Sequence, residues 1–402
     1  MTAVVRYLAA AVAVVAAAYC LVLARAEMLF HRDTEASVAA AVRLVPYNSA
    51  YVARLAAWQP ENKLALLRRA LKLNPWDAES AIQLGLAAEM EQRDAASAKR
   101  YFLQAARVDH MFLPKWTLTN FYFRRQNPTK FFRWAKAALE TTPYPADPVF
   151  TQMWLISNDS EQIARAIPDR PSILLQYAAF LANKSQYAAI PQAIKRLVAL
   201  TGTRDPADFG LYDQIGPLED RLLAAGEVEP ALEVWRTLVR ARWVSGPAPS
   251  PERPIGNGDF RAPFFKHGFD WKPVDSPGVS IDQLPDEKSV RISFSGDEPE
   301  NCRLLEEYLP LEPNRLYWLA WQADGPQLDR QSGLAWRMYP VSEQDQSSEI
   351  SGDLLDRSHP ACDFKSPGGN GLALLALEYH RPQGSTRITG TVTLSAVTAL
   401  PH

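Results

Sequence analysis

Side chains that could do chemistry are few in this sequence, and their spacing fits no catalytic or metal-binding motif. The six histidines are scattered along the chain. Ligand-type side chains gather only in His359-Pro360-Ala361-Cys362-Asp363, which we interpret as a surface loop. Nucleophile elbows, zinc-protease helices and phosphate-cradling loops do not occur in the sequence. The sequence therefore predicts neither a metal site nor a cofactor.

Two further patterns resemble parts of enzyme sites: pairs of adjacent carboxylates and a short glycine-containing motif. Neighbouring carboxylates stand at Glu306-Glu307 and Asp286-Glu287, as glycosidase acid/base work would need. Adjacent residues of a strand point to opposite faces, so neither pair is expected to share a cleft. Gly256-Asn257-Gly258 lacks the third glycine of a dinucleotide-binding pattern. We therefore expect that this protein is not an enzyme.

The three cysteines, Cys20, Cys302 and Cys362, have no paired-thiol spacing for zinc or redox chemistry. Cys302 and Cys362 could form one disulfide in an oxidising compartment or stay as two separate thiols, and the sequence leaves both open.

Length and composition favour two globular domains and a tether. The chain has 402 residues, 47% of them hydrophobic and 22% charged. Residues 246–402 carry more acidic than basic side chains, and residues 1–245 the reverse. The basic runs, such as Arg68-Arg69 and Arg124-Arg125, are too short to build the basic face that nucleic acid requires. We expect no nucleic-acid partner.

The N-terminus carries an apolar segment. Residues 8–24 are uncharged and lie between Arg6 and Arg25. As a helix rising about 1.5 Å per residue, this segment just spans a bilayer core of about 30 Å. Residues 1–26 are therefore a signal anchor or a signal peptide, which places the rest of the chain outside the cytoplasmic (inner) membrane, on the periplasmic or extracytoplasmic side.

Cleavage or retention of this segment is left open. Ala24-Arg25-Ala26 fits a signal-peptidase site that would release a chain beginning at Glu27. Retention is favoured, because residues 27–45 contain no Gly or Pro and could continue as one helix from the membrane. Tyr19 is too bulky for the position before a lipoprotein Cys20.

Similar helix endings recur after the apolar segment. Leu73-Asn74-Pro75, Val108-Asp109-His110 and Thr141-Thr142-Pro143 are spaced by 35 and 33 residues. A shorter interval of 29 separates Pro75 from Pro46, which ends a half-repeat. Gly85 stands where close helix approach needs a small residue, opposite the stripe of Ala98, Phe102 and Ala105.

These intervals bracket the 34-residue period of the tetratricopeptide repeat, and residues 36–144 resemble that superfamily. Residues 145–243 resemble it more weakly, through expected helices at 174–180, 188–200, 212–225 and 231–239. The resemblance implies a right-handed α-solenoid over residues 27–245, with a concave groove for a protein partner. The first-helix candidates for that groove are Gln83, Lys115, Asn120 and Arg124.

Residues 246–254 are rich in proline and are expected to form a semi-extended linker. Beyond them the apolar period changes towards two, which predicts an antiparallel β-sandwich over residues 255–402. The expected strands are residues 289–294, 316–323, 333–341, 372–380 and 386–397.

The opening Ile255-Gly256-Asn257-Gly258-Asp259-Phe260 and the closing Gly390-Thr391-Val392-Thr393-Leu394 resemble carbohydrate-binding jelly-roll modules. Acidic residues of some such modules hold a structural calcium. Arg261 and Ser395-Ala396 stand at the corresponding places here, which argues against calcium.

Strand alternation selects candidate residues for binding a sugar. Tyr317, Leu319 and Trp321 are expected to face the core, as are Leu334, Trp336 and Met338. The opposite faces of these two runs then carry Trp318, Gln322, Arg337 and Tyr339, which we expect to form one glycan platform.

Together these features resemble accessory proteins of bacterial exopolysaccharide and cell-envelope systems. The chain is therefore expected to be multidomain, α then β, and to act as a membrane-tethered scaffold whose repeats bind a protein partner. The alternative is a glycan-binding protein that acts through the β-sandwich and contacts polysaccharide.

Overall fold

The computed structural model describes residues 3–202, 212–326, 331–341, 348–356 and 358–402. The chain divides into two compact units, residues 1–168 and residues 169–402, and each is described by itself. The first unit is helical. The second contains helices followed by two antiparallel β-sheets.

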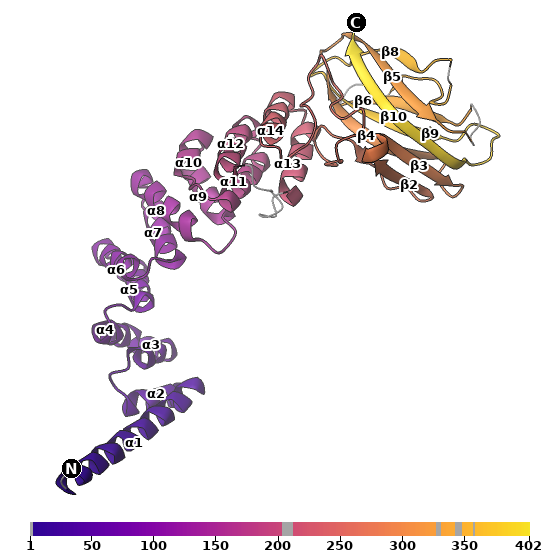
Figure 1. Ribbon diagram of the computed structural model, residues 1–402. Coiled ribbons are helices and arrows are strands. Elements are labelled where there is room, and N and C mark those ends of the chain that lie inside the picture. Colours follow the sequence, from indigo (N-terminus) through magenta and orange to yellow (C-terminus); the bar gives the residue numbers. More distant parts are fainter. Residues whose placement is uncertain (1–2, 203–211, 327–330, 342–347, 357) are drawn as a thin grey trace. The chain divides into compact units, whose positions relative to one another are not determined.

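Helical hairpins that follow one another along the chain build the first unit (Figure 1). α3 packs on α4, α5 on α6 and α7 on α8, and each hairpin also contacts the next. α5 begins at Ala78 and α7 at Phe112, so their starts are 34 residues apart and the predicted repeat period is confirmed. The helices are α1 (Ala3–His31), α2 (Glu35–Leu44), α3 (Ser49–Trp58), α4 (Lys63–Leu73), α5 (Ala78–Met90), α6 (Ala95–Val108), α7 (Phe112–Arg124), α8 (Pro128–Thr141), α9 (Asp147–Ser157) and α10 (Ser160–Ala166), with a 3-10 turn η1 (Pro60–Asn62).

Short polar side chains start the helices of the repeats. Asn48, Asp77 and Asp94 are N-caps of α3, α5 and α6, and each accepts at least one hydrogen bond from a backbone N–H group of the first turn. Those N–H groups have no partner inside the helix, so the caps fix where each helix begins.

The helix expected to continue from the apolar segment through residues 27–45 is interrupted, and that prediction is wrong. α1 ends at His31, and Asp33 adopts a left-handed backbone with φ 48°. Thr34 then caps α2, because its side chain accepts from the Ser37 N–H while the Ser37 hydroxyl accepts from the Thr34 N–H. This reciprocal cap stops and restarts the chain without any Gly or Pro.

Close contact between α5 and α6 depends on Gly85. A Cβ added there would lie 2.4 Å from Cε1 of Phe102, whose ring is fully buried. Ala98 and Ala105 flank Phe102 on α6 and are also fully buried. The small residue on one helix and the large one on the other therefore interlock as the sequence predicts.

The second unit begins with four helices whose approximate ranges the sequence predicts. They are α11 (Pro171–Asn183), α12 (Ile190–Thr201), α13 (Tyr212–Ala224) and α14 (Val228–Arg240), with a 3-10 turn η2 (Tyr187–Ala189). Gly226 has φ 76° in the turn between α13 and α14, a left-handed conformation that favours glycine. The α14 side chain Trp235 is buried.

The strands that follow form two five-stranded antiparallel sheets, of order β1-β4-β9-β6-β7 and β2-β3-β10-β5-β8. Their bounds are β1 (Lys272–Pro273), β2 (Val279–Leu284), β3 (Ser289–Ser295), β4 (Asn301–Pro310), β5 (Leu316–Asp324), β6 (Leu334–Pro340), β7 (Ser348–Glu349), β8 (Ala361–Lys365), β9 (Leu372–His380) and β10 (Thr389–Pro401), with a 3-10 turn η4 (Pro285–Glu287). The expected surface loop at residues 359–363 is partly wrong, because β8 begins inside it. Its edge pairing with β5 satisfies the backbone there.

Both sheets contribute their inner faces to one core, which makes the domain a β-sandwich. Tyr317, Leu319 and Trp321 of β5 are buried in it, as are Leu334, Trp336 and Met338 of β6. Strands 3 to 6 alternate between the two sheets, as does the return through β8, β9 and β10, which is the crossing pattern of a jelly roll.

The proline-rich segment, residues 246–254, lies against the sandwich and does not run free of it. The Tyr317 hydroxyl donates to the Pro251 carbonyl at 3.0 Å, and Arg315 pairs with Glu252 at 3.2 Å. Ser250 and Arg253 close a short turn by bridging each other.

Inside the second unit, the loop before β1 docks onto α13 and α14. The Gly268 N–H donates to Asp220 Oδ1 at 2.9 Å, and His267 Nδ1 lies 2.7 Å from Asp220 Oδ2. The rings of Phe265 and Phe269 pack edge-on against Trp235. The sandwich and the last helices are thus held together by polar and aromatic contacts.

Buried carboxyl groups gather near this docking contact. Glu219 is fully buried on α13, and neither of its oxygens has a hydrogen-bond partner among the described residues. Burial and neighbouring Asp220 raise the pKa of Glu219 well above its usual value. Burial also raises the pKa of Asp270 to about 6, despite hydrogen bonds from Phe265, Trp271 and Asn257, and raises that of Glu307.

Replacement of Gly85 by alanine tests the interlock between α5 and α6. The added methyl group must displace the Phe102 ring, so we expect Gly85→Ala to lower the free energy of unfolding by about 1–3 kcal/mol despite the better helix propensity of alanine. Urea denaturation measures the loss. Phe102→Leu should relieve the clash, so the double variant should be more stable than the sum of the two single effects predicts. Simple additivity would contradict the contact.

Replacement of Glu219 by glutamine tests the buried carboxyl. Because the folded-state pKa of Glu219 is raised, the wild type is more stable at low pH, where the buried carboxyl is neutral. It loses this stability as pH rises from about 4.3, the pKa of an unfolded Glu, through the raised folded-state pKa. We expect Glu219→Gln to gain thermal stability over the wild type at pH 8 and to lose most of this gain at pH 4. The matched control is Glu229→Gln on α14, whose side chain is 82% exposed and should show no such trend. An equal gain at both pH values would contradict the assignment.

Candidate partner-binding groove

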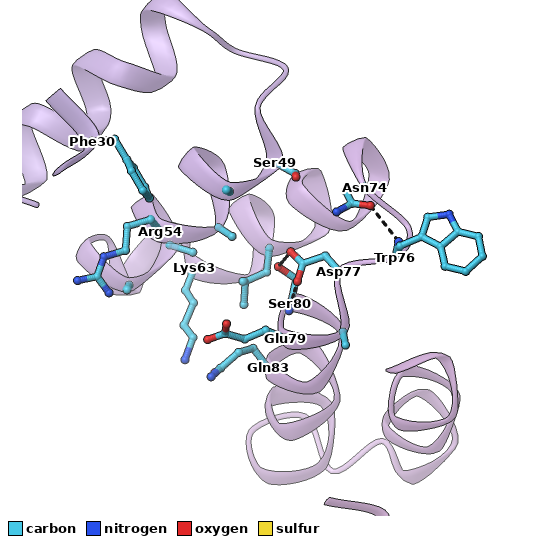
Figure 2. Close-up of a pocket in the computed structure, with 16 residues that line it drawn as sticks. Phe30, Ser49, Arg54, Lys63, Asn74, Trp76, Asp77, Glu79, Ser80 and Gln83 are labelled. Carbon is cyan, nitrogen blue, oxygen red and sulfur yellow. Dashed lines mark hydrogen bonds between the residues drawn. The ribbon is translucent and has the colours of Figure 1, made fainter. Parts of the chain in front are cut away.

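A groove of about 730 Å³ lies between α3 and α5 in the first unit (Figure 2). Its residues come from α3, α5, the loop before α5, the start of α4 and the end of α1. They are Phe30, Ser49, Ala50, Ala53, Arg54, Ala56, Ala57, Lys63, Leu67, Asn74, Trp76, Asp77, Ala78, Glu79, Ser80 and Gln83.

Alanines of α3 leave the space that the groove occupies. Ala50, Ala53 and Ala57 recur at intervals of three and four, so they lie on one face of the helix. Methyl side chains extend little from the backbone, and larger residues at these positions would fill the groove. Figure 2 shows the long side chains of Arg54, Lys63, Glu79 and Gln83 around this space.

Side chains of both charge signs line the groove. Arg54 binds Asp33 through two nitrogens, with Nε 2.7 Å from Oδ1, and Trp58 Nε1 donates to the same oxygen at 3.2 Å. The Arg54 hydrogen bond lowers the pKa of Asp33; burial acts in the opposite direction, and the Trp58 hydrogen bond adds to the lowering. The pKa of Arg54 is raised in return, and the nearby Glu79 carboxylate adds to this effect.

The loop before α5 is held in place by its own polar side chains. The backbone N–H of Trp76 donates to Asn74 Oδ1 at 3.1 Å. Asp77 accepts from the backbone N–H of Ser80 at 3.0 Å and from the Ser80 hydroxyl at 2.6 Å. The Trp76 indole is 73% exposed and points away from Lys63 and Gln83 (Figure 2). This loop is a preformed wall of the groove.

Of the four groove residues proposed from the sequence, Gln83 lines this groove. Sequence reasoning missed Arg54, although a signal for it exists. Arg54 precedes Gln83 by 29 residues, the same interval that separates Pro46 from Pro75, so the two residues occupy equivalent repeat positions.

The other three proposed groove residues bond to neighbouring helices. Arg124 binds Glu89 of α5 through Nε at 3.2 Å and Nη2 at 2.6 Å, and Arg125 binds the same carboxylate at 2.5 Å. Asn120 Oδ1 accepts from Gln152 of α9 at 2.7 Å. Lys115 Nζ lies 3.4 Å from the Thr141 hydroxyl of α8. Arg124 and Asn120 thus link α7 to the first helices of adjacent hairpins.

The four residues proposed as one glycan platform lie on two different sheets. Trp318 and Gln322 belong to β5, whereas Arg337 and Tyr339 belong to β6 of the opposite sheet. Each pair faces away from the shared core, as alternation predicts, so the two pairs are on opposite sides of the sandwich. The single four-residue platform is therefore wrong.

Arg337 and Tyr339 take part in an ionic network around Glu378. The Tyr339 hydroxyl donates to Glu378 at 2.5 Å, and Arg303 donates to the same oxygen at 3.0 Å. Burial would raise the pKa of Glu378, but hydrogen bonds from Tyr339, His380 and Arg303 outweigh it and lower the pKa. The Arg303 guanidinium also stacks over the Tyr339 ring at 4.1 Å. On the other sheet, the Trp318 side chain is 40% exposed.

The residues that the sequence suggested for metal or thiol chemistry do not form a common site in the described part of the chain. Within the described ranges, no group of three or more His, Cys, Asp or Glu could hold a metal ion. Arg261 pairs with Asp259 at 2.9 Å, next to the opening considered for calcium. Cys302 on β4 and Cys362 on β8 belong to different sheets, and both are free thiols.

Comparison with known proteins gives structural similarities only. No family model matches the chain, and no curated protein matches it. Among solved structures, PilW, a type IV pilus biogenesis factor, is similar with a TM-score of 0.27 and 14% identity over 56% of this chain and 93% of its own. PilF of Pseudomonas aeruginosa has a TM-score of 0.26 and 18% identity over 48% of this chain and 91% of its own.

A third similar structure is YrrB, described as a tetratricopeptide-repeat protein with an unusual peptide-binding site. Its TM-score is 0.26, with 14% identity over 52% of this chain and 94% of its own. The description of the helices as tetratricopeptide-like rests on the spacing and packing within this chain itself.

Removal of the arginines that bind Glu89 tests the link between α5 and α7. The Glu89 side chain is 5% exposed, and either guanidinium alone can still pair with it. We expect Arg124→Ala or Arg125→Ala to cost at most about 1 kcal/mol each, because both arginines are partly exposed. The double variant leaves a buried carboxylate unpaired and should cost about 3 kcal/mol. Urea denaturation of the single and double variants measures the coupling, and additive effects would show that Glu89 does not depend on the pair.

Proposed function

We propose that this protein is a non-enzymatic interaction scaffold that binds a segment of a protein partner in the groove between α3 and α5. The observation that supports this most strongly is a groove of about 730 Å³ with an alanine floor and charged walls. Its volume is as large as that of small-molecule pockets, roughly 300–1,000 Å³, which is room for a few side chains of a partner segment.

The lining side chains suit a polypeptide that carries polar groups along its length. Lys63 and Glu79 offer charges of opposite sign, and the amides of Asn74 and Gln83 can both donate and accept hydrogen bonds. An extended peptide presents N–H and C=O groups at regular intervals, which such amides can bind. The apolar surfaces of Phe30 and Leu67 provide room for an apolar side chain of the partner.

The proposed setting is the outer face of a bacterial cytoplasmic membrane, with α1 as a retained single-pass anchor. α1 is long and apolar enough to cross a membrane. Ala26 is fully buried against α2 and α3, and Leu23 packs against the same cluster. Cleavage after Ala26 would remove core contacts of the first repeat, which favours retention. A role in exopolysaccharide assembly is the expectation of the sequence resemblance alone.

The rival function is glycan binding by the sandwich. It is less favoured because Trp318 and Gln322 lie on a different sheet from Arg337 and Tyr339, so no four-residue platform exists. Tyr339 and Arg337 are also bound to Glu378.

Filling the groove tests the proposal. Peptides are selected from a phage-displayed random library on the full chain, and their affinities are measured by fluorescence anisotropy. We expect Ala57→Phe to weaken the selected peptides at least about tenfold, or 1.4 kcal/mol, because the ring occupies their space. The matched control is Ala65→Phe, at an exposed position of α4 outside the groove lining.

The same proteins are tested on a glycan array together with Trp318→Ala. Peptides whose affinity is unchanged by Ala57→Phe would overturn the groove as the binding site. Binding to a polysaccharide that Trp318→Ala abolishes, with no peptide selected, would favour the glycan-binding function instead.

A further inference from the structure

The last part of the apolar helix α1 belongs to the first repeat. Leu23, Leu29 and Phe30 pack against a cluster that includes Val38 and Tyr51. The Phe30 and Tyr51 rings lie 4.8 Å apart. Burial, together with the hydrogen bond to Glu27, raises the pKa of Tyr51 to about 12. This end of α1 therefore cannot leave the repeat without exposing its core.

Helix α2 returns along α1 after the cap at Thr34, and the loop that follows α2 reaches Tyr19. The hydroxyl oxygens of Tyr19 and Tyr47 lie 2.6 Å apart. Tyr19 is 12 residues before His31, or about 18 Å along the helix axis. The repeat thus extends back along α1 as far as Tyr19.

The charges that bound the apolar segment place Tyr19 inside a membrane span. Residues 7–24 are uncharged, and Arg6 and Arg25 flank them. Their length of about 27 Å is needed almost entirely to cross a core of about 30 Å. Tyr19 precedes Arg25 by six residues, or about 9 Å along the helix. When α1 spans the membrane, the loop that bonds to Tyr19 through Tyr47 therefore lies at the membrane surface.

The end of α2 and the loop that joins it to α3 have the composition of a membrane-interface segment. Tyr47 is 55% exposed, Leu44 is 37% exposed and Arg43 is exposed. Arg69 donates to the Pro46 carbonyl at 2.7 Å, which adds a second cation. Tyrosine and arginine are favoured at the headgroup layer, where rings and long side chains meet apolar and polar surroundings together.

We propose that residues 43–48, which are the last two residues of α2 and the loop to α3 and are here named the interfacial loop, are seated in the lipid headgroup layer. The inference rests on the proposed membrane anchor. Leu44 and Tyr47 enter the boundary between headgroups and acyl chains, at the depth of roughly 5–10 Å that interfacial segments reach. Ser49 and Ala50 directly follow this loop and line the groove. The groove therefore lies next to the membrane surface and suits a partner segment presented close to the bilayer.

Site-directed fluorescence of the full chain in nanodiscs of phosphatidylcholine and phosphatidylglycerol tests the proposal. Single cysteines carrying an environment-sensitive dye are introduced as Leu44→Cys and as Tyr47→Cys, the first of which keeps the Tyr19 contact. The background lacks the native cysteines (Cys20→Ala, Cys302→Ser and Cys362→Ser). Controls are Val14→Cys in the apolar segment and Tyr144→Cys in the equivalent loop three hairpins further on, where the tyrosine is 65% exposed.

We expect the dye at residues 44 and 47 to shift its emission to the blue and to lose most of it to lipids spin-labelled near the headgroup. The dye at residue 144 should behave as it does in water. Blue-shifted emission at residue 14 with water-like emission at both 44 and 47 would overturn the interfacial loop while the anchor stands. Water-like emission at residue 14 as well would overturn the anchor itself, and with it this inference.

Discussion

Burial of each helical hairpin against its neighbours is the interaction on which the first unit depends. A single pair of ten- to fourteen-residue helices covers too little apolar surface to offset the conformational entropy of ordering it. The buried alanines and aromatic rings of α5 to α8 exclude water only because successive hairpins contact each other. Close approach at Gly85 and Phe102 sets how tightly one such pair can pack.

The same stacking explains why some polar first-helix residues line an open groove and others bond to neighbouring helices. Where α7 meets α5 and α9, Arg124 and Asn120 bond to Glu89 and Gln152 and link the hairpins. Between α3 and α5, small alanines separate the polar side chains, and a groove remains. Short α3 and α4, of ten and eleven residues, accompany the shorter repeat interval at this place.

In the second unit, the loop before β1 connects the β-sandwich to helices α13 and α14. Asp220 holds the His267-Gly268 loop, and Trp235 packs against two phenylalanines of that loop. Gly268 has φ 63°, and a Cβ there would lie 2.5 Å from the Trp235 ring, so glycine is required for this approach. Burial raises the pKa of Glu219 and Asp270 near this contact, which predicts that its stability depends on pH.

Local patterns in the sequence determined the repeat period, the apolar helix and the inward faces of β5 and β6, because helix and strand periodicities are properties of neighbouring residues. Two things followed from tertiary structure alone. In a jelly roll consecutive strands cross between sheets, so Trp318 and Tyr339 fall on opposite sides although their strands are adjacent in sequence. The use of Arg124 as a link depends on which helices lie beside it. Alternation along one strand or helix cannot specify its neighbour, since that choice is made by long-range packing.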